Sequence, residues 1–101
     1  MKFGLKDEIL DKICSIFQKF SLIERALIYG SRAKGNFRAS SDIDIVLIGK
    51  ELRLKDLYKI ENLIDELLLP YSFDISLYHQ IDNIDLINHI DRVGVKLYKK
   101  Y

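Results

Sequence analysis

The chain has 101 residues, the length of one ordinary domain, which excludes a two-domain enzyme. Hydrophobic residues make up 49% and charged residues 31%, a globular balance that excludes a disordered chain. Lys and Arg number 16 against 15 Asp and Glu, and the net charge of +1 gives no support for binding to nucleic acid or to a membrane surface.

The first half of the chain predicts a helix, a strand and a polar loop. Apolar side chains recur at three- and four-residue intervals over residues 6–20, the period of a helix that buries one stripe. A short apolar run at 25–29, stopped by Gly30, favours a buried strand. Residues 31–41 hold few apolar side chains and predict a loop with room for one helical turn.

The second half predicts two further strands and two helices. Residues 42–48 alternate at first and then become wholly apolar, as in a strand whose first half reaches solvent. Helical spacing returns over 52–69 and stops at Pro70. Residues 72–78 alternate as a third strand, and 82–92 predict a last helix that Gly94 would cap.

This order predicts an α+β fold in which helices flank a sheet of three strands, or four if residues 95–98 add an edge strand. The ten or so residues between the first two strands are long for a tight hairpin and short for a helical crossover. The sequence therefore leaves the pairing direction of those strands open.

Three aspartates fall on the predicted strands. Asp42 and Asp44 point to the same side because side chains alternate along a strand, and their repulsion would be relieved by a divalent cation. Hard oxygen ligands suit Mg²⁺ better than a soft-ligand metal. If the third strand lies beside the second, Asp74 joins them from its polar face and completes a cluster of three carboxylates.

The loop before Asp42 carries the opposite charge. It is Gly- and Ser-rich, and from residue 25 to residue 41 there are four basic residues and no acid: Arg25, Arg32, Lys34 and Arg38. Glycine lets backbone N–H groups approach phosphate oxygens, a serine hydroxyl can donate another hydrogen bond, and a helical turn starting there would direct its positive end at an anion. The loop and the carboxylates together suit a metal-bridged polyphosphate.

These residues carry a resemblance to a known family. Gly30-Ser31, ten intervening residues and then Asp-x-Asp, with Gly35 closing a Gly-Ser-Arg-Ala-Lys-Gly turn and a later strand aspartate, resemble the nucleotidyltransferase superfamily that includes DNA polymerase beta. The chain is most similar to the minimal nucleotidyltransferases, called MNT or, as antitoxins, MntA-like proteins. The resemblance spans nearly the whole chain, and Lys34 stands where arginine is common in the family.

The resemblance implies a nucleotidyltransferase fold with a mixed sheet, in a single minimal domain over residues 1–101. It implies Mg²⁺-dependent transfer of a nucleoside monophosphate, AMP from ATP being favoured, to a hydroxyl of a partner protein. The implied catalytic residues, which would also hold one or two Mg²⁺ ions, are Asp42, Asp44 and Asp74. The implied nucleotide-binding residues are Gly30, Ser31, Arg32 and Ser41.

The resemblance also indicates a partner. Many family members are encoded with a HEPN-domain toxin, and MntA-like antitoxins neutralise it by adenylylating a toxin tyrosine. We therefore expect a HEPN toxin or another substrate-binding protein subunit, no membrane and no direct nucleic acid, and a homo-oligomer stays open. The alternatives are a non-catalytic binding antitoxin or scaffold, and a small-molecule nucleotidyltransferase that needs a separate substrate-binding subunit.

The remaining reactive residues favour no competing chemistry. Gly35 is followed by Asn36, which excludes a Walker-type phosphate loop. Cys14 is the only cysteine, so no intramolecular disulfide or multi-cysteine zinc site can form, and with no apolar segment of membrane-spanning or signal-peptide length we expect a cytoplasmic protein. His79 and His89 lack a partner at metal-ligand spacing and are interpreted as structural or surface residues.

Overall fold

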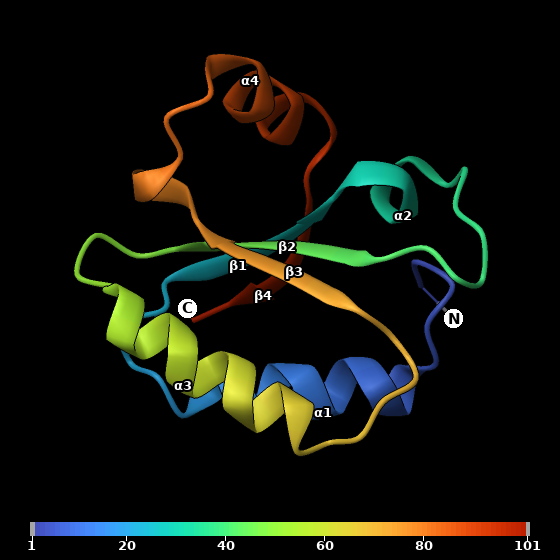
Figure 1. Cartoon of the computed structure of the whole chain (residues 1–101), viewed down its shortest axis with the longest axis horizontal. Helices are drawn as coiled ribbons and strands as arrows, with labels where there is room; N and C mark the ends of the chain where they lie inside the picture. Colours follow the sequence, from blue (N-terminus) through green and yellow to red (C-terminus); the bar gives the residue numbers. More distant parts are fainter. Residues whose placement is uncertain (1, 101) are drawn as a thin grey trace.

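One mixed four-stranded sheet, in the order β3-β2-β1-β4, forms the centre of the chain in a computed structural model that describes residues 2–100 (Figure 1). In chain order the elements are α1 (Asp7–Gln18), β1 (Arg25–Tyr29), α2 (Gly30–Lys34), β2 (Ile43–Ile48), α3 (Leu54–Asp65), β3 (Phe73–Leu77), the 3₁₀ turn η1 (Tyr78–Gln80), α4 (Ile84–Val93) and β4 (Val95–Lys99). The predicted α+β class is confirmed, and so is the fourth strand at the sheet edge.

The strand pairing resolves the direction that the sequence left open. β1 pairs antiparallel with both β2 and β4, whereas β2 and β3 run parallel. Helix α3 forms the crossover connection between these two strands, and a parallel pair requires such a connection. The sheet is therefore mixed, with β3 and β4 at its two edges.

The two faces of the sheet differ in what covers them. Helices α1 and α3 lie side by side on one face, and α2 and α4 lie on the other (Figure 1). Residues that alternate toward α1 and α3, such as Ile28, Ile45 and Ile75, belong to the main hydrophobic core. A smaller cluster of Tyr29, Val46 and Ile90 lies on the α4 face. The α4 face thus leaves room for polar side chains beside a small apolar contact.

The helices follow the predicted apolar periods, with different ends. The predicted helix over 52–69 is shorter in the structure, Leu54–Asp65. Leu68 adopts a φ of 53°, a left-handed conformation that cannot continue a helix, so the helix stops before Pro70 is reached. The last helix is capped at its start by Asn83, whose side chain accepts from the N–H groups of Asp85 and Leu86.

Between residues 2 and 100, no helix is both long enough and apolar enough to span a membrane.

Candidate active site

A row of polar side chains crosses three strands on the α4 face of the sheet. Tyr29 on β1 is the register partner of Asp44 on β2, and Asp44 is the register partner of Asp74 on β3. Asp42 lies just before β2, which begins at Ile43, and its negative charge acts on Asp44. Neighbouring strands are about 4.8 Å apart, so these side chains are close neighbours. We call Asp42, Asp44 and Asp74 the carboxylate row.

The three carboxylates are coupled electrostatically. Burial raises the pKa of Asp44 above its ordinary value of 3.8, and the negative charges of Asp74 and Asp42 raise it further. His89 on α4 acts in the opposite direction and lowers it. Asp44 is half-buried, whereas Asp42 and Asp74 are exposed. The row is therefore a patch of repelling negative charge with its centre at Asp44.

The carboxylate row fits magnesium by its chemistry and its position on the strands. Carboxylate oxygens are the hard donors that Mg²⁺ prefers, and Asp44 and Asp74 occupy adjacent register positions. Within residues 2–100, no group of three or more His, Cys, Asp or Glu side chains is already arranged to hold a metal ion. The predicted three-carboxylate ligand set therefore stays a prediction, supported by register and charge.

The turn at Gly30 lies directly against the centre of the row. Gly30 has a φ of 74°, which residues with a side chain rarely adopt. A Cβ atom at this position would also collide with the Asp44 carboxylate, at Oδ2. Two independent requirements thus select glycine here. The short helix α2 begins at this residue, confirming the predicted helical turn, and Ser31 follows half-buried in its first turn.

Arg32, one of the predicted nucleotide-binding residues, has a buried side chain, and its nucleotide-binding role stays a prediction. Its side chain is 2% exposed, and its guanidinium lies 5.2 Å from the ring centre of Phe37 and 5.3 Å from that of Tyr71. Four hydrogen bonds use up most of its five N–H donors. The acceptors are the carbonyl oxygens of Phe3 at 2.8 Å, Ala39 at 3.2 Å and Ser41 at 2.9 and 3.2 Å. The described contacts of Arg32 therefore hold the loop that leads into β2.

Ser41 is fixed within the same loop. Its carbonyl accepts from Arg32, and its hydroxyl oxygen accepts from the backbone N–H of Arg38 at 2.8 Å. The residue directly precedes Asp42, so the anchored loop sets where the carboxylate row begins. Lys34 and Arg38, the other basic residues of the loop after Gly30, have exposed side chains.

Tyr29 and His89 also lie at the site, although sequence reasoning did not place them there. Tyr29 is buried, and its ring meets the ring of His89 edge-on, with centroids 6.1 Å apart. Burial, then Asp74 and Asp44, raise the pKa of Tyr29, while a hydrogen bond with Ser76 lowers it. Strand alternation could have found Tyr29, which shares a face with Asp44. Nothing in the sequence shows that α4 packs on this face and brings His89 to it.

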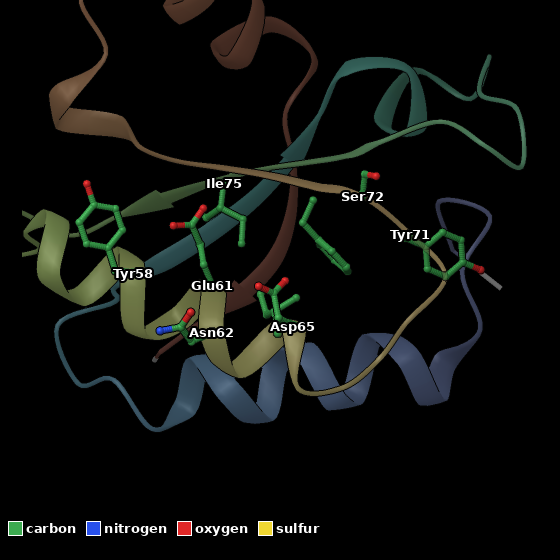
Figure 2. Close-up of a pocket in the computed structure, with 9 residues that line it drawn as sticks. Tyr58, Glu61, Asn62, Asp65, Tyr71, Ser72 and Ile75 are labelled. Atoms are coloured by element: carbon green, nitrogen blue, oxygen red, sulfur yellow. The ribbon is translucent and has the colours of Figure 1, made fainter.

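A cavity of about 630 Å³ lies on the other face of the sheet, between α3 and β3 (Figure 2). None of its lining residues belongs to the carboxylate row. The cavity is therefore a separate feature from the carboxylate row.

Comparison with known proteins identifies relatives at the level of sequence. The sequence profile described as "Polymerase beta, Nucleotidyltransferase" matches residues 11–101. A curated protein from Methanocaldococcus jannaschii, named "Putative protein adenylyltransferase MJ0141", is 28% identical over an alignment of 78 residues; the match covers 74% of this chain and 79% of the relative.

Several solved structures share the fold. A chain from the crystal structure of a toxin-antitoxin with AMP-PNP superposes with a TM-score of 0.73 over 89% of this chain and 73% of that chain, at 17% identity. A chain from the tri-AMPylated Shewanella oneidensis HEPN toxin in complex with MNT antitoxin gives 0.68 over 94% and 73%, at 15% identity. A chain from the MntA-HepT toxin-antitoxin gives 0.67 over 93% and 73%, also at 15%. At these identities the likeness shows a common fold.

Proposed function

This chain belongs to the polymerase beta nucleotidyltransferase family, and we propose that it transfers AMP from ATP, with Mg²⁺, to a hydroxyl group of a partner protein. One observation carries the proposal at the level of residues: Asp44 and Asp74 are register partners, and the turn at Gly30 lies against the Asp44 carboxylate. The site therefore joins a pair of acids to a backbone turn that only glycine can form.

The carboxylate row would hold magnesium through Asp42, Asp44 and Asp74. When bound, Mg²⁺ would neutralise phosphate charge and help to align the reacting oxygens. Transfer of a phosphoryl-type group depends mainly on positioning and charge neutralisation, so a small open site suffices for the chemistry.

The chain's own groups would orient the substrates. The Gly30 backbone and the Ser31 hydroxyl would contact the triphosphate beside Asp44. The acceptor oxygen attacks the α-phosphorus, the bond to the bridging oxygen breaks, and pyrophosphate leaves. The carboxylate of Asp74, exposed on the edge strand, would take the proton of the incoming hydroxyl.

Arg32 and Ser41 enter this proposal as positioning residues. Their hydrogen bonds fix the loop between α2 and β2, and this loop sets the relation between Gly30 and Asp42. Arg32 has most of its donors committed within the chain, so the proposal does not use it as a phosphate ligand.

A HEPN-domain toxin is the acceptor that we favour. The M. jannaschii relative is named as a protein adenylyltransferase, and the chains that share the fold come from toxin-antitoxin complexes, one of them with an AMPylated HEPN toxin. We infer that the present chain acts as the antitoxin of such a pair by adenylylating a toxin tyrosine.

The test combines the chain, its HEPN partner, ATP and Mg²⁺, and measures the partner's mass. We expect a gain of one AMP on a tyrosine, abolished by Asp44→Asn, Asp74→Asn or a chelator, and weak preference among the four nucleoside triphosphates. Toxin neutralisation without any adduct, unchanged in both variants, would instead establish a binding-only antitoxin.

A further inference from the structure

The cavity between α3 and β3 is a groove with an unusual lining. From α3 it is lined by the buried Ile64 and by Tyr58, Glu61, Asn62 and Asp65; the last three follow Tyr58 by three, four and seven residues and so share one face of the helix with it. Figure 2 shows Glu61 and Asp65 directed from α3 toward the strand, with Tyr58 at one end of the groove. We call this the α3–β3 groove.

The strand beside the groove is an open sheet edge. β3 is the terminal strand, and among residues 2–100 no other strand pairs with its outer side. The Ser72 carbonyl accepts from the Ile43 N–H at 2.9 Å, so Ser72 faces β2. In a parallel pair only alternate residues bond to the neighbour, so Phe73 and Ile75 direct their N–H and C=O groups outward. Such groups are a template for another strand.

The groove is acidic in a chain whose positive and negative charges nearly balance. Its nine lining residues include Glu61 and Asp65 but no Lys or Arg, whereas the whole chain has a net charge of +1. Tyr58, 57% exposed, adds an aromatic face that suits a Lys or Arg side chain. Charge complementarity therefore selects a cationic occupant.

We propose that the α3–β3 groove binds an extended, Lys- or Arg-bearing segment of the partner protein, which adds to the sheet as a strand beside β3. Main-chain hydrogen bonds to Phe73 and Ile75 would supply affinity, and basic side chains facing Glu61 and Asp65 would supply specificity.

The pleat of the added strand gives this proposal a second part, which rests on the proposed function. Side chains of the segment alternate between the two faces of the sheet. If the basic residues face the groove, the residues between them face the α4 side, next to Asp74. A hydroxyl residue flanked by basic residues would thus bring its oxygen to the carboxylate row.

Peptide binding to the intact chain tests the first part. The probe is a blocked decapeptide of alternating Lys and Thr, and the comparison peptide replaces Lys with Glu. We expect binding of the Lys peptide alone, weakened by salt. The double variant Glu61→Gln with Asp65→Asn should bind about tenfold more weakly at low salt, a few-fold for each of the two charges. The matched control is Glu66→Gln, an acid at the end of α3 that does not line the groove. Equal binding of the two peptides, or an equal loss in the control, overturns the proposal.

Amide hydrogen exchange distinguishes strand addition from mere charge attraction. The peptide should slow exchange at the N–H groups of Phe73 and Ile75, which are open in the free chain. Two further peptides carry N-methyl groups on the backbone nitrogens of either the odd or the even residues. One of them should lose binding, because its methyl groups replace the N–H groups that face β3, and the other should still bind. Protection that appears elsewhere, or a uniform effect of methylation, contradicts an added strand.

The failure of this proposal and that of the proposed function are separable. Asp44→Asn should bind the peptide normally, since Asp44 lies on the other face of the sheet from the groove. Normal peptide binding without AMP transfer refutes the enzymatic proposal and leaves the groove assignment standing. Transfer to the partner that is unaffected by the groove variants refutes the groove assignment alone.

Discussion

Replacing Asp44 with asparagine should stabilise the fold while abolishing transfer. The substitution removes the charge at the centre of the carboxylate row and keeps nearly the same shape. The pKa of Asp44 is raised first by burial and then by Asp74 and Asp42, so the ionised side chain opposes folding. Sites that hold like charges together for function commonly reduce stability in this way.

The expected gain follows from the spacing of the strands. Two unit charges about 5 Å apart repel by roughly 1 to 2 kcal/mol at an effective dielectric constant of about 40 to 80. Solvent and salt screen a partly exposed pair, so we expect about 1 kcal/mol. In a domain of this size, that raises the Tm by about 4 to 8 °C.

The stability difference between Asp44→Asn and the natural chain should depend on pH. Below the ordinary value of 3.8 the carboxyl is protonated in both states, and the variant and the natural chain should be equally stable. As the pH rises from 3.8 to the raised pKa, the unfolded chain releases this proton while the folded chain keeps it, so the natural chain loses stability; above the raised pKa the advantage of the variant is complete. Thermal unfolding by circular dichroism at pH 3 and pH 7 measures it, with Asp82→Asn, outside the row, as control. Mg²⁺ should raise the Tm of the natural chain more than that of the variant. A variant that is less stable at pH 7, or whose advantage persists at pH 3, would refute this reasoning.

Three other substitutions or modifications test the surrounding structure. Gly30→Ala should lower the free energy of unfolding by about 1 to 3 kcal/mol and abolish transfer, because the new Cβ meets both an unfavourable φ and the Asp44 carboxylate; urea unfolding with intact stability would contradict this. Arg32→Met should cost about 3 kcal/mol because several partly buried carbonyls lose their donor, whereas a surface change such as Lys34→Met should be nearly neutral in the same assay. Burial and, secondarily, Asp11 raise the pKa of Cys14, so alkylation should be slow in the folded chain and fast in urea; rapid labelling of the folded chain would show that the thiol is not protected.

Periodic segments of this fold were predictable, and contacts between distant segments were not. The apolar period of α3 is local information, and it predicted that helix apart from its ends. The register of Asp44 with Asp74 depends on the parallel pairing of β2 with β3, two strands that α3 connects. The local sequence pattern predicts only that each acid lies on the polar face of its own strand.

Arg32 shows why charge on a loop is a weak guide to role. A basic residue in a Gly- and Ser-rich turn reads as a phosphate ligand, because solvent exposure is the default for arginine. Here the backbone carbonyls of Phe3, Ala39 and Ser41, which come from two separate segments, converge on it, and backbone acceptors leave no mark in a sequence. His89 was missed for a related reason, since its neighbours come from the sheet beneath α4.

The bond from Arg32 to the Phe3 carbonyl links the site to a segment 29 residues upstream. Phe3 itself has a φ of 58°, and a Cβ on the next residue, Gly4, would collide with the ring of Phe37. Residues 3 and 4 thus support the loop between α2 and β2 from outside the site. On the proposed function, a substitution near residue 3 should therefore change the affinity for the nucleotide. Substitutions at these two residues would change nucleotide affinity while the three aspartates stay unaltered.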